Sequence, residues 1–201
     1  MYGVFAFASW LSPSIVLKLG PRLSMMLAGV TYLFNIIQLL YINEVSIYIA
    51  SAVLGMGAPI LWTAQGTFLS YNSDAGTITR NSGVFWAMNT SSTFIGMLFA
   101  YYQFQDQPMI EKKTRMMLGY VLTAASGVGI ALMFFLRPTP WAKQHSKDSM
   151  MTTLKNTGKL FLTKDMLMFS FTLFYTGLHQ TLWGGVYSAS IGFTKGFDTV
   201  N

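Results

Sequence analysis

Residues 46–70 read SIYIASAVLGMGAPILWTAQGTFLS and contain no Lys, Arg, Asp or Glu. A helix needs about 20 apolar residues to cross the hydrocarbon core of a bilayer, because each residue rises only about 1.5 Å. This segment is long enough, and similar uncharged segments lie on both sides of it. The first of them, with about 17 residues, is at the lower limit of this length. Together they predict an all-α integral membrane protein with six transmembrane helices, at residues 1–17, 23–41, 46–70, 82–104, 116–136 and 166–191.

The composition agrees with a membrane protein. The chain is 52% hydrophobic and 10% charged, whereas soluble domains are about 25% charged. A soluble helix would interrupt each apolar run with charges, because one face must meet water. The net charge of +6 comes without clusters of Lys and Arg interleaved with aromatic residues, so no nucleic acid is expected. The expected partner is the lipid bilayer, and the chain is expected to be a multi-pass membrane protein.

The basic residues predict the orientation of the segments. Alternate connections between them carry nine Lys and Arg residues on one side and four on the other. The positive-inside rule places the richer set in the cytosol, so the amino terminus and the end of the chain are expected to face outward. The richer set is Lys18, Arg22, Arg80, Arg137, Lys143, Lys147, Lys155, Lys159 and Lys164, and the poorer set is Lys112, Lys113, Arg115 and Lys195.

Residue types that perform catalysis or bind metals are scarce. The chain has no Cys and only two His, namely His145 and His179. All seven acidic residues lie in the connections or at the flanks of the apolar segments. No zinc-protease, nucleophile-elbow or phosphate-loop motif occurs. We therefore expect no enzymatic activity, no metal site and no cofactor.

Polar and small residues inside the apolar segments have two interpretations each. Gln65, Asn89 and His179 either line a central cavity or form hydrogen bonds between helices, because a polar group in lipid needs a partner or water. Small residues that recur every four positions predict close helix packing. These stripes are Ser51 and Gly55 with residues 57–59, then Ser92, Gly96 and Ala100, then Thr123, Gly127 and Ala131, then Gly184, Ser188 and Gly192.

The connection at residues 137–165 is the longest in the chain. Met151, Leu154 and Phe161 fall on one face of a predicted helix, with Lys155 and Lys159 off that face. This pattern predicts either a basic amphipathic helix on the inner membrane surface or a solvated linker. In both cases the connection divides five predicted spans from one.

Three stretches carry a resemblance to a known family. Residues 12–25 read SPSIVLKLGPRLSM, residues 61–66 read LWTAQG and residues 80–87 read RNSGVFWA. The first is similar to the loop between spans two and three of the major facilitator superfamily. The other two resemble its Unc-93-like branch, the ion channel regulatory type, and most of all the orphan major-facilitator-domain members of that branch. The residues that carry these motifs are Gly20, Arg22, Trp62, Thr63, Gln65, Gly66, Arg80, Asn81, Gly83 and Trp86.

The resemblance implies a partial major facilitator superfamily helical bundle. The six segments then correspond to spans two to seven of a twelve-span fold. Residues 1–136 supply five spans of the amino-terminal half, residues 137–165 form the cytosolic connection between the halves, and residues 166–201 contain the first span of the other half. We therefore expect a fragment, a truncated gene product or a splice product. Leu17 stands where the superfamily loop has Asp, so the resemblance does not extend to the charge relay of that loop.

Two functions follow from the resemblance. The first is transport of an unidentified small solute across the membrane, with Gln65, Asn89 and His179 as polar contacts. The second is an accessory role, in which the protein regulates a channel or the trafficking of a membrane receptor and has a channel or receptor subunit as its partner. A third interpretation is a nonfunctional truncated product. None of the six segments contains an acidic residue, which argues against ordinary proton coupling.

Overall fold

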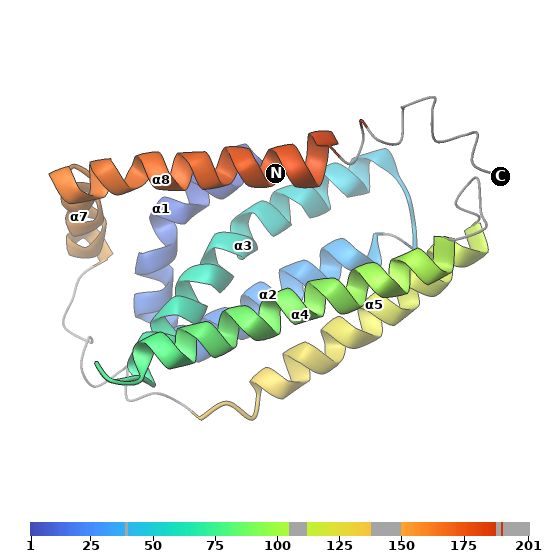
Figure 1. Ribbon diagram of the computed structural model, residues 1–201, viewed down its shortest axis with the longest axis horizontal. Coiled ribbons are helices and arrows are strands. Elements are labelled where there is room, and N and C mark those ends of the chain that lie inside the picture. The colour runs from blue at the N-terminus through green and yellow to red at the C-terminus, as the bar shows by residue number, and fades with distance from the viewer. Residues whose placement is uncertain (39, 105–111, 138–149, 188–189, 191–201) are drawn as a thin grey trace. The chain divides into compact units, whose positions relative to one another are not determined.

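The computed structural model describes residues 1–38, 40–104, 112–137, 150–187 and 190 (Figure 1). Every regular element within these ranges is helical, so the predicted all-α class is confirmed for them. The chain forms two compact units, Met1–Leu154 and Lys155–Asn201. The elements in chain order are α1 (Tyr2–Leu19), α2 (Pro21–Ile37), α3 (Glu44–Tyr71), α4 (Ile78–Phe104), α5 (Lys112–Met133), α7 (Met150–Phe161), α8 (Lys164–Thr181) and the π-helix η1 (Leu182–Tyr187).

Three of these helices, α1, α3 and α5, are long and apolar enough to cross a membrane. The other three predicted spans differ for physical reasons. Helix α2 has only 17 residues, α4 contains Arg80 and a run of polar residues at 89–93, and α8 includes Lys164, Asp165, His179 and Gln180 among its 18 residues. The structure therefore supports a membrane helical bundle, and the count of six spans stays a prediction.

Gly20 separates α1 from α2. Its backbone has φ 80° and ψ 155°, and its N–H donates to the Val16 carbonyl at 2.8 Å. A residue with a Cβ is strained at this positive φ, whereas glycine adopts it freely. Pro21 follows as the first residue of α2. Proline is tolerated there because the N–H groups in the first turn of a helix have no partner within the helix. The Gly–Pro pair therefore ends one helix and starts the next without a loop.

Polar side chains begin α3 and α4. The Asn43 side chain accepts a hydrogen bond from the Val45 N–H at 3.0 Å, which caps the first turn of α3. Before α4, the Asp74 carboxylate accepts hydrogen bonds from the hydroxyl and the N–H of Thr77, both at 2.8 Å. The bond from the Thr77 hydroxyl is the main reason that the pKa of Asp74 lies below its usual value. Asp74 is thus held ionised in the turn that leads into α4.

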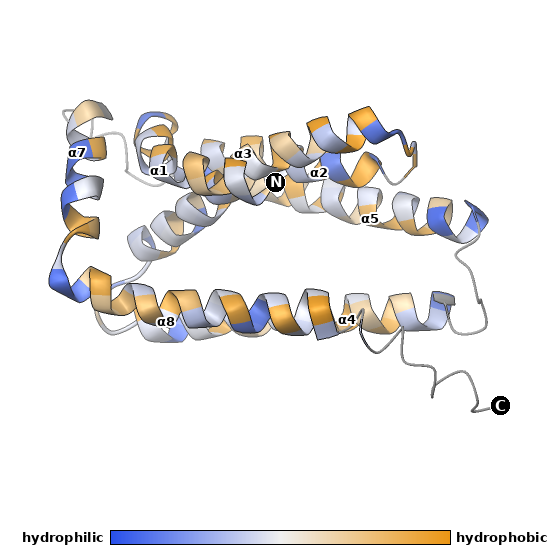
Figure 2. Ribbon diagram, turned by 90° about the horizontal axis from the view of Figure 1, so that it is seen from above, coloured by the Kyte–Doolittle hydropathy of each residue, from blue (hydrophilic) through white to orange (hydrophobic). Residues whose placement is uncertain are grey.

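Helix α3 is the central element of the first unit. It packs against both α1 and α2, and α2 packs in turn against α5. The buried apolar side chains are mostly small, and Val16, Met25 and Ala64 form one cluster with partly buried side chains around them. Helix α4 contacts α3 but stands apart from the layer of α1, α2, α3 and α5, as Figure 2 shows. Most of the described side chains of α4 are consequently exposed.

The predicted small-residue packing is confirmed for α3. A Cβ on Gly55 would lie 3.1 Å from the Val4 Cβ in α1, and one on Gly57 would lie 2.7 Å from the Thr31 Cβ in α2. The corresponding stripes in α4 and α5 do not pack in this way, since a Cβ on Gly96 or Gly127 would meet no described atom within 4 Å. The same holds for Gly184, and Ser188 and Gly192 lie outside the described residues. Of the predicted stripes, only the one on α3 therefore packs closely; outside the stripes, a Cβ on Gly29 of α2 would lie 3.1 Å from the Ile130 side chain of α5.

Replacing Gly57 with alanine should destabilise the first unit by about 1–3 kcal/mol, because the new methyl group overlaps the Thr31 side chain. The Thr31 hydroxyl already donates to the Ala28 carbonyl at 2.7 Å, so the side chain must give up this bond to move. Reversible unfolding in mixed micelles would measure the effect. The matched control is Gly66→Ala on the same helix, where a Cβ meets open space. Equal stability losses in the two variants would contradict the proposed close contact.

Candidate functional site

Trp62 joins the two family motifs of the first unit. Its ring, on α3, lies 6.1 Å from the Trp86 ring in a stacked arrangement and 6.4 Å from the Phe85 ring edge to face. Both partners come from the RNSGVFWA stretch of α4. The Trp62 side chain also lies close to the hydroxyl of Tyr32 in α2. The aromatic junction of Tyr32, Trp62, Phe85 and Trp86 therefore connects three helices.

The indole rings of this junction are only partly covered. Trp62 is 43% exposed and Trp86 is 56% exposed. The stacking of the two rings is favourable, but it leaves much of each ring open to the surroundings. The sequence motifs contain Trp62 and Trp86, but sequence reasoning did not identify Phe85 or Tyr32 as members of the same cluster. The RNSGVFWA stretch includes Phe85 and was the available signal for it. No comparable signal pointed to Tyr32.

Gln65 and Asn89 flank the junction but do not meet. Gln65 lies one turn after Trp62, and Asn89 lies one turn after Trp86; both are half-buried. Helix α3 runs toward the 72–77 connection and α4 runs away from it. Gln65 is therefore nearer to that connection than Trp62, and Asn89 is farther from it than Trp86. Among the described residues, no hydrogen bond joins the two amides. Each is consequently available to a ligand only as a separate polar group.

The remaining motif residues of α3 and α4 shape the hairpin. The Asn81 amide donates to the Ser73 hydroxyl at 2.9 Å and so ties the start of α4 to the preceding turn. Arg80 is exposed in the first turn of α4, and a Cβ on Gly83 would meet open space. On α3, the carbonyls of Thr63 and Gly66 accept hydrogen bonds from hydroxyl groups one turn later, at 2.7 and 2.9 Å.

Arg22 links the start of α2 to the end of α5. Its guanidinium donates a hydrogen bond to the carbonyl of Phe134, just after the last residue of α5. The unpaired carbonyls at the end of a helix carry partial negative charge, so a cation there is favourable. The Arg22 Nε is buried without a described partner. Gly20 provides the preceding turn, and the two motif residues thus act together at one end of the first unit.

His179 belongs to the second unit and lies in a row of aromatic rings. Its ring is 6.2 Å from the Tyr175 ring and 6.2 Å from the Trp183 ring, and Trp183 is 4.7 Å from Tyr187. These residues recur every four positions, so they share one face of α8 and η1. All four are exposed. The spacing was visible in the sequence, but sequence reasoning considered His179 without its neighbours.

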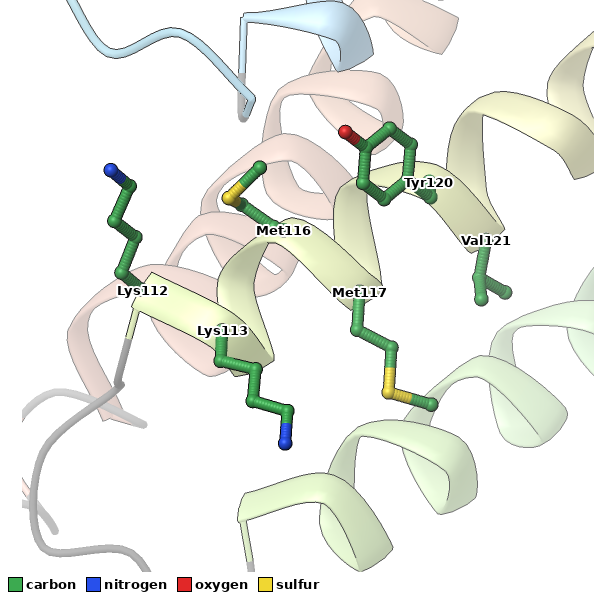
Figure 3. A pocket seen from close by; sticks show the side chains of 6 residues that line it. All are labelled: Lys112, Lys113, Met116, Met117, Tyr120 and Val121. Atoms are coloured by element: carbon green, nitrogen blue, oxygen red, sulfur yellow. The ribbon is translucent and has the colours of Figure 1, made fainter.

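A shallow hollow lies elsewhere, on α5. Figure 3 shows the six side chains that line it, and all of them come from this helix. The lining contains none of the predicted site residues, and its open shape along one helix suits contact with lipid better than capture of a solute. The described residues contain no group of His, Cys, Asp or Glu that could hold a metal ion. The lining residues are Lys112, Lys113, Met116, Met117, Tyr120 and Val121.

Comparison with known proteins decides the family. The family model described as "Ion channel regulatory protein UNC-93" matches residues 1–201. The chain belongs to the UNC-93 family. An UNC93-like protein MFSD11 from Xenopus tropicalis is 34% identical over 218 residues, which cover 98% of this chain and 49% of the relative. The MFSD11 of Xenopus laevis is 33% identical over 219 residues, with 99% and 49% covered.

A plant member of the UNC-93 family also matches. UNC93-like protein 3 of Arabidopsis thaliana is 27% identical over 147 residues, which cover 68% of this chain and 32% of the relative. The chain spans about half the length of the two Xenopus relatives. No solved structure matches it. The family and the apolar helices together identify an integral, multi-pass membrane protein of the major facilitator type.

The stacked indoles predict a measurable coupling between α3 and α4. In a double-mutant cycle with Trp62→Leu and Trp86→Leu, the coupling energy should be about 0.5–1.5 kcal/mol, as for other aromatic pairs. Unfolding of the purified protein in mixed micelles would supply the four stabilities. Trp10→Leu in α1 combined with Trp86→Leu is the control cycle, and these two changes should add to within about 0.5 kcal/mol. Additivity of the Trp62 and Trp86 changes would contradict the junction.

Loss of the Arg22 contact should loosen the end of α5. Arg22→Gln should lower the local opening free energy by about 1 kcal/mol, because a charged donor to a helix carbonyl is lost. The amides of Phe134, Phe135 and Leu136, which donate to carbonyls one turn earlier, should then exchange with deuterium about fivefold faster. Lys18→Gln, an exposed change in the last turn of α1, is the control. Unchanged exchange in Arg22→Gln would show that the contact contributes nothing.

Proposed function

We propose that this protein takes part in the transport of a small solute across the membrane, and that the α3–α4 hairpin lines its pathway. The observation that carries this proposal is the aromatic junction between the two family motifs. Trp62 lies nine residues before Tyr71, the end of α3, and Trp86 lies eight residues after Ile78, the start of α4. At about 1.5 Å per residue, both rings lie roughly 12–14 Å from their helix ends.

This depth is near the middle of a hydrocarbon core about 30 Å thick. Substrate sites of secondary transporters lie near that midplane, between two helical halves. The half-exposed indoles and the flanking amides of Gln65 and Asn89 offer apolar surface and a few polar groups there. Such a combination is typical of small-molecule sites. The proposed substrate is therefore a small solute with an apolar or aromatic part, and His179 is a further proposed contact.

We place the proposed pathway within an arrangement of six spans. Residues 1–136 contribute five spans, residues 137–165 the cytosolic connection, and residues 166–201 a sixth span. Arg22 and Arg80 then lie on the cytosolic side, where basic residues anchor helix ends near the headgroups. Since no span carries a carboxylate, the proposed movement of the solute does not use an acidic residue as a proton carrier.

A second candidate function is regulation of an ion channel or of receptor trafficking. Two observations favour it: the family description names ion channel regulation, and α4 exposes large apolar side chains along its length. A channel or receptor subunit within the bilayer is the kind of partner that would contact this surface. The exposed apolar residues include Val84, Met88, Phe94, Ile95, Met97 and Leu98.

Thiol accessibility separates the two functions, and the chain contains no native Cys that would interfere. Gln65→Cys and Asn89→Cys, each introduced alone, should react with a membrane-impermeant cationic methanethiosulfonate at least about tenfold faster than Val128→Cys, because polar groups in a pathway face water. Val128 is exposed on α5 and is expected to face lipid. Reaction of the amide positions no faster than this control would contradict a pathway. Phe94→Cys that crosslinks to a channel subunit in native membranes would instead favour regulation.

A further inference from the structure

Helix α7, Met150–Phe161, is not used by the proposed function. Its sequence MMTTLKNTGKLF contains two lysines and no acidic residue. At 100° per residue, Leu154 and Phe161 lie on one face together with Met151. Lys155 and Lys159 lie next to this face, on the side of Met151, and Asn156 lies opposite it. Helix α7 is thus amphipathic, with its positive charges along one edge of the apolar face.

The apolar side of α7 is only partly covered by protein. Met151 is 61% exposed and Phe161 is 52% exposed, and Leu154 between them is half-buried. A helix with such exposed apolar side chains in water would lose free energy, because each buried CH₂ contributes about 0.8 kcal/mol. A short helix with one polar and one apolar face is therefore most stable at a boundary between a charged layer and an apolar layer.

The connection to α8 places α7 at such a boundary. Only Leu162 and Thr163 separate the two helices. The N–H of Leu162 donates to the Lys159 carbonyl at 3.2 Å, and the Thr163 hydroxyl donates to the Leu160 carbonyl at 2.7 Å. These bonds end α7, and the helix turns away from the axis of α8 (Figure 2). Helix α8 belongs to the predicted sixth span, so its first residue, Lys164, is expected near the membrane surface. A helix that precedes this residue at an angle to α8 then lies at the level of the lipid headgroups.

We propose that α7 binds the surface of an anionic phospholipid bilayer. Leu154 and Phe161 insert between the upper acyl chains, and Lys155 and Lys159 interact with the negative headgroups. The cytosolic leaflet is the anionic one in cells, and the distribution of basic residues predicts that residues 137–165 are cytosolic. Electrostatic attraction and apolar insertion act together in this mode of binding. The proposal does not depend on solute transport.

Site-specific labels in the full chain test the proposal. Leu154→Cys and Phe161→Cys would be labelled with an environment-sensitive fluorophore, and Asn156→Cys on the polar face is the matched control. The protein would be reconstituted in vesicles of phosphatidylcholine alone or with added phosphatidylserine. We expect a blue shift, and quenching by spin-labelled lipids, at the two apolar positions but not at the control. Both effects should be stronger with phosphatidylserine and weaker at high salt.

The charge contribution is tested with Lys155→Gln/Lys159→Gln. In phosphatidylserine vesicles, the ratio of inserted to detached α7 should fall about fivefold for each lysine removed. Lys112→Gln/Lys113→Gln in α5 removes the same charge elsewhere and should leave the ratio unchanged. Labels that stay in water in both membranes would overturn the proposal, and so would insertion that does not respond to phosphatidylserine. Blue-shifted labels without quenching by lipid would show that α7 packs on protein and would also overturn it.

Discussion

The close approach of α3 to α1 and α2 is the contact on which the rest of the first unit depends. Lipid is as apolar as the side chains it surrounds, so apolar burial alone gives two membrane helices little reason to associate. Gly55 and Gly57 remove the side chains that would keep the backbones apart, and dispersion contacts then accumulate along the interface. Helix α5 is held indirectly, through its packing against α2 and the bond from Arg22 to the Phe134 carbonyl.

Hydroxyl groups inside the helices are satisfied without any neighbouring helix. Ser12 donates to the Ala8 carbonyl at 2.8 Å, and Thr67 donates to the Thr63 carbonyl at 2.7 Å. Thr176 on α8 donates to the Thr172 carbonyl in the same way. Because this local bond removes the cost of an unpaired group in lipid, Ser and Thr within a span say little about a binding site. The amide of Asn81 is more informative, since it donates to the Ser73 hydroxyl eight residues earlier in the chain.

The sequence allowed the helices to be predicted, because an uncharged run of suitable length in lipid has few alternatives to a helix. It placed their ends less well. Helix α4 begins at Ile78, several residues before the uncharged segment, because the geometry of the preceding turn, not charge, decides where the helix starts. The sequence could not show which small-residue stripe makes close helix contacts, because four segments carry such stripes. Only the stripe on α3, which lies between α1 and α2, makes them. The ring contacts of Trp62 depend on side-chain orientation, and the change to a π-helix at Leu182 depends on the local backbone hydrogen-bond pattern. Residue spacing specifies neither.

The α3–α4 junction differs in kind from the other helix contacts of the first unit. It depends on the rings of Trp62, Phe85 and Trp86 and on one connection that Asp74 and Asn81 fix through hydrogen bonds. No glycine-mediated backbone contact of the type seen at Gly57 is described along α4. Ring contacts at Phe85 and Trp86 and exposed apolar surface along the remainder leave α4 less constrained than α1, α2 or α3. Both proposed functions require such an element, because alternating access moves helices against a fixed scaffold and a regulatory subunit needs an unoccupied helix face for its partner.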